Sequence, residues 1–215
     1  MKYGQRLSKP RNPTKIVWPM NDVDESNRKP GKLLPWLLSV AAAAAMVLAL
    51  NLLGRIWWCK YGDPAIYVKE AWNSPHTSQH LLDPYTFTHV LHGVVLFWLT
   101  VLIFPKLENT WRFFIATVAE AGWEVLENTS FIIEKYRANT ASLDYFGDSI
   151  LNSAGDLGAC AAGFIIAARL GPWRSLAFFI AVELFLLLWI RDGLLLNILM
   201  LIYPLDAIKI WQTSV

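Results

Sequence analysis

The chain contains a long apolar stretch at residues 33–53, which reads LLPWLLSVAAAAAMVLALNLL. It holds no Asp, Glu, Lys or Arg. At about 1.5 Å per helical residue it reaches about 30 Å, which is the thickness of the hydrocarbon layer of a membrane. A cleavable signal peptide has a shorter apolar core and a shorter leader than residues 1–32. The stretch therefore predicts a membrane-spanning helix that is retained in the mature protein.

Four more apolar segments follow this one along the chain. The whole sequence is 55% hydrophobic and 17% charged, whereas soluble domains are about 45–50% apolar and about 25% charged. The predicted fold class is all-α, a polytopic transmembrane helix bundle of about five spans, in which residues 33–215 form one domain. The four further spans are predicted at residues 85–104, 111–133, 148–170 and 173–190.

A shorter apolar stretch, residues 194–203, follows the fifth predicted span after Arg191-Asp192-Gly193. It is too short to cross a membrane as a separate helix. It extends the fifth helix, re-enters the membrane as a sixth short segment, or lies in the interface. The sequence leaves these three alternatives open.

Residues 1–32 predict a basic cytoplasmic tail that is partly disordered. The segment contains four prolines and eight of the 19 Lys and Arg residues, and no helical or strand period runs through it. A basic segment ahead of a span sets the orientation of that span, and we expect no nucleic-acid partner. With this tail in the cytoplasm, that side of the membrane holds 12 Lys and Arg against 7 on the other side. The bias follows the positive-inside rule.

Two cysteines and two loop histidines lie apart from any recognisable motif. Cys59 follows the first predicted span, and Cys160 lies about 18 Å deep in the fourth, so we expect no disulfide between them. His76 and His80 belong to the polar connection between the first two spans, where a solvated role is expected.

Ionisable residues within the spans form three groups. At about 100° per residue, the acids of the third span, including Glu134 at its outer end, fall on one narrow helical face. The polar residues of the fourth span are spaced four apart, and Gly155, Ala159 and Gly163 on the same side allow another helix to approach closely. The residues are His89 and His92; Glu120, Glu124, Glu127 and Asn128; and Asp148, Asn152 and Asp156.

The three groups are predicted to lie in one layer, roughly 6–12 Å below the outer membrane surface. A charged side chain in the membrane costs at least about 2.5–3.5 kcal/mol, so these residues must face inward and pair, hold protons or bind a cation. A shared proton, a histidine–carboxylate pair or a divalent metal ion would each satisfy the cluster. We expect Glu124, Glu127 and Asp156 as catalytic candidates, Asn128, Asn152 and Asp148 as binding candidates, and His89 and His92 as metal ligands.

Structural roles compete with these functional ones. Either histidine alone is more often a satisfied residue of the bundle than a ligand, and Glu120 can serve only to pair with Arg or a backbone group. Asp148 can be the N-cap of the fourth span, and Asn128 and Asn152 can be hydrogen-bonding contacts between helices. Glu183 and Arg191 are expected either to partner the cluster or to pair with each other.

The stretch from Asp148 to Gly158 resembles the D-x-x-x-N-x-x-G signature of VanZ-like bacterial membrane proteins. Asp83 with His89, and Glu124 or Glu127, match two further features of those proteins. The fuller pattern, with HVLHG at 89–93 and WEVLEN at 123–128, resembles an uncharacterised family of multi-pass bacterial inner-membrane proteins. This resemblance covers roughly residues 33–212. It implies location and topology, and it supplies no activity, cofactor or catalytic residue.

Two functions follow as hypotheses. The first is an intramembrane site, open to the periplasmic face, that binds or acts on a lipid-linked or amphiphilic substrate with a divalent metal ion as a candidate cofactor. The second is a non-enzymatic accessory or assembly subunit of a larger membrane complex, for which the 11 Trp residues would supply lateral contacts. A proton or ion pathway is disfavoured, because the inner halves of the spans are apolar. The expected partners are the lipid bilayer and other membrane-protein subunits.

Overall fold

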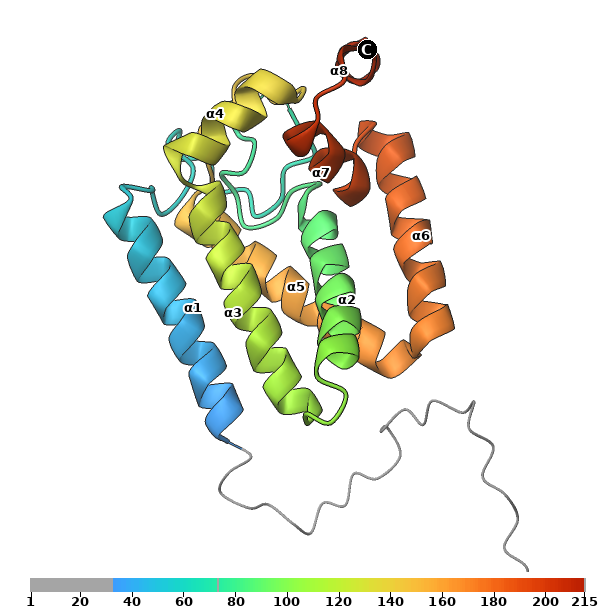
Figure 1. The fold of residues 1–215 in the computed structure, drawn as a ribbon. Coiled ribbons are helices and arrows are strands. Elements are labelled where there is room, and N and C mark those ends of the chain that lie inside the picture. Colours follow the sequence, from blue (N-terminus) through green and yellow to red (C-terminus); the bar gives the residue numbers. More distant parts are fainter. Residues whose placement is uncertain (1–32, 73, 215) are drawn as a thin grey trace, which may run out of the picture.

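A computed structural model describes residues 33–72 and 74–214. These residues form eight α-helices and no strand, with one isolated bridge between Tyr67 and Leu82 (Figure 1). The predicted all-α class is confirmed, whereas the predicted tail of residues 1–32 lies outside the described residues. The helices are α1 (Leu34–Leu52), α2 (Thr86–Ile103), α3 (Asn109–Glu127), α4 (Ser130–Asn139), α5 (Ile150–Leu170), α6 (Pro172–Ile190), α7 (Leu194–Ile202) and α8 (Asp206–Thr213).

Four of the helices, α1, α2, α5 and α6, are long and apolar enough to cross a membrane. Each carries apolar residues around most of its circumference, as a helix in lipid requires. The remaining predicted span, the third, corresponds to α3, which has a similar length but contains three glutamates and Arg112. It packs against α1, α2 and α5 (Figure 1), so its polar face lies within the bundle.

The contact between α2 and α5 depends on glycine. A Cβ atom on Gly93 would lie 2.0 Å from the carbonyl oxygen of Cys160, and one on Gly163 would lie 1.9 Å from that of Val90. Both distances are far below van der Waals contact, so no larger residue fits without separating the helices. Small residues let membrane helices approach this closely. The close approach predicted for the Gly163 side of the fourth span is therefore present.

The predicted third span, residues 111–133, is wrong at its outer end. The helix α3 ends at Glu127, and α4 begins at Ser130 after an extended backbone at Thr129. Glu134 consequently lies on α4 and is exposed, so it does not share the inward face of Glu120, Glu124 and Glu127. Helical periodicity alone could not detect this break, because Thr129 caps a new helix without interrupting the apolar pattern.

Of the three alternatives for residues 194–203, the structure excludes an extension of the fifth predicted span, because α6 ends at Ile190 and α7 is a separate helix. The chain leaves α6 through Arg191, which has a left-handed φ of 52°, and turns before α7 begins. Glu183 accepts hydrogen bonds from the backbone nitrogens of Leu194 and Leu195, at 2.8 and 3.4 Å, and so caps α7. Arg191 donates to the carbonyl of Trp211. Glu183 and Arg191 therefore form no ion pair with each other among the described contacts, and neither joins the polar cluster. Both expectations, a mutual pair and a role as partners of the cluster, are wrong.

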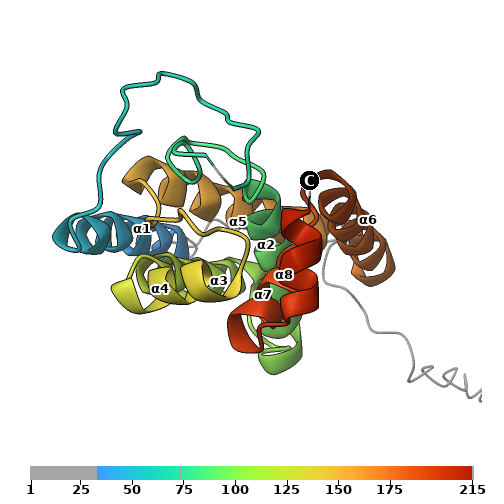
Figure 2. The same ribbon diagram turned by 90° about the horizontal axis from the view of Figure 1, so that it is seen from above.

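One end of the bundle gathers most of the connecting structure. The helices α4, α7 and α8 and the described part of the 53–85 connection lie at this end, which is at the top of Figure 1. Figure 2 looks onto this end and shows the connection passing over α5. The start of α1 and the turns joining α2 to α3 and α5 to α6 lie at the opposite end.

Candidate functional site

Glu120 holds the two span histidines together. Its Oε1 atom lies 2.7 Å from Nδ1 of His89 and 2.9 Å from Nδ1 of His92, while its Oε2 lies 3.1 Å from the latter. The two imidazole rings meet edge to face, with centroids 4.8 Å apart. The carboxylate therefore bridges two residues that lie one helical turn apart on α2.

His89 also faces two further acids. Its Nδ1 lies 3.2 Å from Oε1 of Glu124, and its Nε2 lies 3.9 Å from Oδ2 of Asp156. Three carboxylate oxygens have no hydrogen-bond partner among the described residues: Oε1 and Oε2 of Glu124, and Oδ1 of Asp156. Because leaving a buried acceptor unpaired costs about 1–3 kcal/mol, these oxygens require a proton or a ligand.

Asn128 fixes Asp148 from two directions. Its side-chain nitrogen donates to Oδ2 of Asp148 at 2.8 Å, and its side-chain oxygen accepts from the backbone nitrogen of Asp148 at 2.7 Å. Tyr145 donates its hydroxyl to Oδ1 of Asp148 at 2.9 Å. The N-cap of α5 is Ser149, whose side chain accepts from the backbone nitrogen of Asn152, so Asp148 is not the helix cap.

Asn152 joins α5 to the connection that precedes α2. Its side-chain nitrogen donates to the carbonyl of His80 at 2.8 Å and lies 3.5 Å from Oδ2 of Asp83. Asp83 in turn accepts from the backbone nitrogens of Tyr85 and Thr86 at the start of α2. Asn128 thus links the end of α3 to Asp148, and Asn152 links α5 to the backbone at His80. Both form hydrogen bonds between segments, which is the structural role predicted for them.

Burial raises the pKa of Asp83, which precedes α2, and that of Asp148, which precedes α5. Asp148 is buried, and loss of solvation raises its pKa above the ordinary value although Tyr145 and Asn128 oppose the shift. The pKa of Asp83 is also raised, first by burial and then by the charge of Asp148. Two neighbouring buried carboxyls disfavour each other's ionisation, so this end of the site favours a proton or a cation.

A cleft of about 670 Å³ of empty space, part of it open to solvent, lies over the cluster. It reaches five of the eight predicted site residues, while Glu124, Asn128 and Asn152 lie behind its surface. The floor is polar, and α7 supplies an apolar wall with Leu194, Ile198 and Leu201. The five lining residues are His89, His92, Glu127, Asp148 and Asp156.

Three overlapping sets of side chains in the cluster could hold a metal ion. Within each set one possible ligand atom per residue lies within 4.8 Å of the others. His89 belongs to two of the sets and Glu124 also belongs to two, and four carboxylates on the long helices face only two imidazoles. The sets are His89, His92 and Glu120; His89, Glu124 and Asp156; and Glu124, Glu127 and Asp148.

The sequence reasoning gave too little weight to Glu120 and did not include the tyrosines. Glu120 is the acid that contacts both histidines, and its place on the same helical face was the available signal. Tyr136 and Tyr145 line the cleft from outside the predicted spans, and Tyr85 lines it from the first position of the second. Their contribution depends on tertiary contacts between loops and α4, which helical periodicity does not report.

Residues 50–214 match the model of a family described as "Protein of unknown function (DUF2585)". The chain belongs to this family. All eight predicted site residues, and Glu120 with them, fall inside the matched segment. The expectation of an uncharacterised bacterial family is thereby confirmed.

Curated relatives cover nearly the same extent. A UPF0314 protein of Rhizobium meliloti (strain 1021) is 47% identical over 185 residues, which are 84% of this chain and 91% of that protein. One of Paracoccus denitrificans (strain Pd 1222) is 44% identical over 177 residues, 80% of this chain and 91% of its own. A UPF0314 protein of Novosphingobium aromaticivorans is 38% identical over 199 residues, which are 86% of this chain and 98% of that protein. No solved structure matches significantly.

Proposed function

We propose that this DUF2585 protein is a multi-pass protein of the bacterial inner membrane that binds an amphiphilic, lipid-linked substrate in its cleft and acts on it by acid–base chemistry. Four candidate spans, the excess of Lys and Arg on the N-terminal side and the bacterial relatives support this location. In this proposal α3 also crosses the membrane, which brings the number of spans to five, and the cleft opens at the periplasmic end.

The cleft's combination of unsatisfied acids and an apolar wall carries the proposal. Oε2 of Glu127 and Oδ1 of Asp156 have no hydrogen-bond partner among the described residues, and both residues line the cleft. Apolar side chains of α7 line the same cleft. A polar head group would meet the acids while an attached hydrocarbon chain would lie along α7, which is how a site suits an amphiphile.

The residues then have distinct roles. Glu127 lies at the cleft surface and is the proposed general base, because a base must reach the proton it removes. His89 and His92, paired through Glu120, are proton donors or cation ligands. Asn128 and Asn152 are positioning residues, since they hold Asp148 and the His80 segment in place.

A divalent cation fits the same cluster. The set of Glu124, Glu127 and Asp148 offers only oxygen ligands, which Mg²⁺, Ca²⁺ and Mn²⁺ prefer. The set of His89, Glu124 and Asp156 adds an imidazole nitrogen, which suits Mn²⁺, Fe²⁺ or Zn²⁺. When bound, such an ion would neutralise the excess of carboxylates and polarise an oxygen of the substrate.

Retention of lipid during purification tests the proposal. We expect the detergent-purified protein to carry a specific amphiphile detectable by mass spectrometry, and Glu127→Gln and Asp156→Asn to lose it by roughly tenfold or more, as loss of a charge-assisted contact predicts. Glu134→Gln is the matched control, because Glu134 is an exposed acid on α4. Equal retention in all four folded proteins would exclude the cleft as the binding site.

The accessory-subunit hypothesis predicts a different result. Native protein isolated from its own membrane would then be part of an assembly of fixed stoichiometry, and folded Glu127→Gln and Asp156→Asn variants would assemble normally and support the same cellular phenotype.

A further inference from the structure

The connection between α1 and α2 holds a second cluster, which is separate from the intramembrane acids. Residues 53–85 contain little regular structure in their described part. A connection of this length without secondary structure is uncommon in a compact domain. Ser78 accepts from the backbone nitrogen of Ser149, and Gln79 donates its side-chain amide to the carbonyl of Gly147. These bonds attach the second half of the connection to the start of α5.

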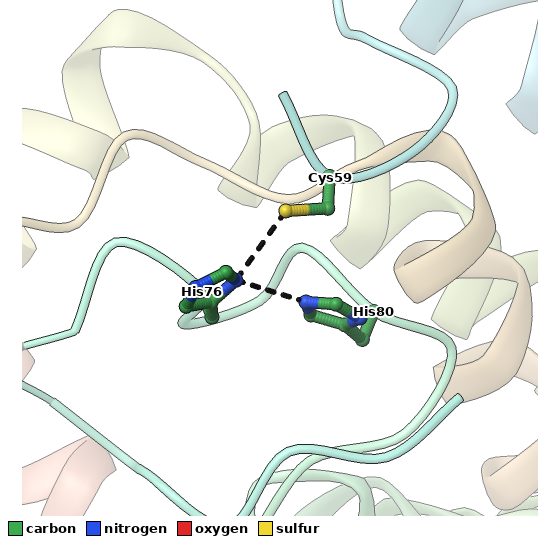
Figure 3. A group of neighbouring side chains, drawn as sticks. All are labelled: Cys59, His76 and His80. Atoms are coloured by element: carbon green, nitrogen blue, oxygen red, sulfur yellow. Dashed lines mark hydrogen bonds between the residues drawn. The ribbon is translucent and has the colours of Figure 1, made fainter. Parts of the chain in front are cut away.

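Three metal-binding side chains converge within this connection (Figure 3). Sγ of Cys59 lies 3.4 Å from Nδ1 of His76, which lies 3.2 Å from Nε2 of His80. Around a tetrahedral zinc ion, bond lengths of about 2.3 Å to sulfur and about 2.0–2.1 Å to nitrogen place neighbouring ligand atoms about 3.3–3.6 Å apart. The two measured separations are therefore close to those of a zinc site.

The protonation of His80 favours a cation at this point. Its Nδ1 atom contacts the carbonyl oxygen of Ala65 and must donate to it, so Nε2 carries a lone pair directed toward His76. One proton on Nδ1 of His76 can satisfy only one of its two close contacts well. A metal ion accepts a lone pair from all three residues. Hydrogen bonding of the second imidazole nitrogen to a carbonyl is also the usual way in which a metal-binding histidine is oriented.

The cluster combines a buried core with an access path. Cys59 is 5% exposed and His80 is fully buried, whereas the His76 side chain is 30% exposed. Oδ2 of Asp63 lies 3.8 Å from Nδ1 of His76, on a half-exposed side chain. Three protein ligands with a carboxylate nearby leave a fourth position for Asp63 or for water, as in many zinc sites.

We propose that Cys59, His76 and His80 bind one Zn²⁺ ion that clamps the α1–α2 connection. The clamp ties residue 59, next to α1, to the 76–80 segment, which lies against α5. Thr77 and Ser78 of that segment line the cleft, and the carbonyl of His80 accepts the hydrogen bond from Asn152. The ion would thus hold one edge of the cleft without taking part in the chemistry of the acid cluster.

Metal content of the full-length protein tests the proposal, with an affinity tag that contains no histidine. After loading with equimolar Zn²⁺ and gel filtration in detergent, we expect about one zinc ion per chain in the wild type and a loss of at least about tenfold in Cys59→Ser and His76→Ala. Cys160→Ser, which changes the other buried free cysteine, should keep its zinc. So should the double variant His89→Gln/His92→Gln, which removes both imidazoles of the acid cluster and leaves the three loop ligands intact.

Cobalt substitution gives an independent readout. Co²⁺ bound through Cys59 should show visible absorption bands and a thiolate charge-transfer band. Cys59→His should keep the metal and lose only the charge-transfer band. Retention of the metal also shows that this variant is folded. Zinc binding that survives in Cys59→Ser, that disappears only in His89→Gln/His92→Gln, or that is absent from folded wild-type protein would overturn the proposal. None of these results bears on lipid retention by Glu127 and Asp156.

Discussion

Asn128 and Asp148 are joined by two hydrogen bonds that run in opposite directions, one from the side-chain amide at 2.8 Å and one from the Asp148 backbone nitrogen at 2.7 Å. Asn128 is the first residue after α3, and Asp148 lies two residues before α5. The pair therefore fixes the register of two long helices at the level of the cleft and holds one carboxylate of the cluster in place.

Asn128→Ala should destabilise the protein by about 2–4 kcal/mol, because it leaves a buried backbone N–H and a buried carboxylate oxygen without their partner. Asn128→Asp should be at least as harmful, since it directs a second carboxylate at Asp148. Thermal unfolding in detergent measures both effects. Asn51→Ala is the control, because Asn51 is exposed on α1, and a melting temperature for Asn128→Ala equal to that of the control would disprove the locking role.

Gly163→Ala should push α2 and α5 apart and cost about 1–3 kcal/mol, as overpacking does elsewhere, because the new Cβ would meet the carbonyl oxygen of Val90. The matched change Gly158→Ala lies on the same helix, where a Cβ meets nothing within 4 Å, and it should be neutral or slightly stabilising. Unfolding of both variants by heat in one detergent makes the comparison. Equal stabilities would show that the helices do not touch at Gly163.

Asp192 should make stability depend on pH between about 4 and 6. Burial raises its pKa from 3.8 to about 6, although Tyr85 donates a hydrogen bond to it and Gly193 donates another. The folded state thus binds the proton more tightly than the unfolded state, so the group favours folding below pH 4 and this advantage is lost as the pH rises through 6.

Asp192→Asn removes this titration. Its stability relative to the wild type should increase between pH 4 and pH 8 by at most about 3 kcal/mol, the value of a shift of about two pKa units. Melting temperatures of both proteins across this range provide the measurement. A constant difference at all pH values would show that Asp192 has an ordinary pKa in the folded protein.

The C-terminus should lie on the periplasmic side. In the proposed topology, five crossings by α1, α2, α3, α5 and α6 would carry the chain from a cytoplasmic N-terminus to the end that holds α7 and α8 (Figure 1). Alkaline phosphatase fused after Val215 should therefore be active, and the same fusion at Lys106, between α2 and α3, should be inactive. The reverse pattern would invert the orientation, and inactivity of both fusions would mean that α3 does not cross the membrane.

Much of the cluster could be predicted from the sequence because helices impose fixed geometry. The spacing of Glu120, Glu124 and Glu127 placed them on one face of α3, and His89 and His92 faced them from α2, as their estimated depth indicated. Apolar length alone located α1, α2, α5 and α6 to within a few residues.

The errors fall where tertiary contacts override a regular pattern. Glu134 fits the periodicity of α3 but belongs to α4, because the backbone is extended at Thr129. The prediction of a solvated His80 is wrong, because this residue is fully buried, and nothing in the sequence shows that α5 and its preceding loop cover the α1–α2 connection. The direction of α7 depends on the left-handed Arg191 and on capping by Glu183, neither of which leaves a periodic signal.

The apolar wall of the cleft comes from α7, which follows all five long helices along the chain and is therefore synthesised after them. The long helices and their acids are complete before this wall exists. A chain that stops before Leu194 would keep all five long helices and yet expose its carboxylates on one side. Synthesis of α7 is thus also the step at which the cleft acquires its amphiphilic character.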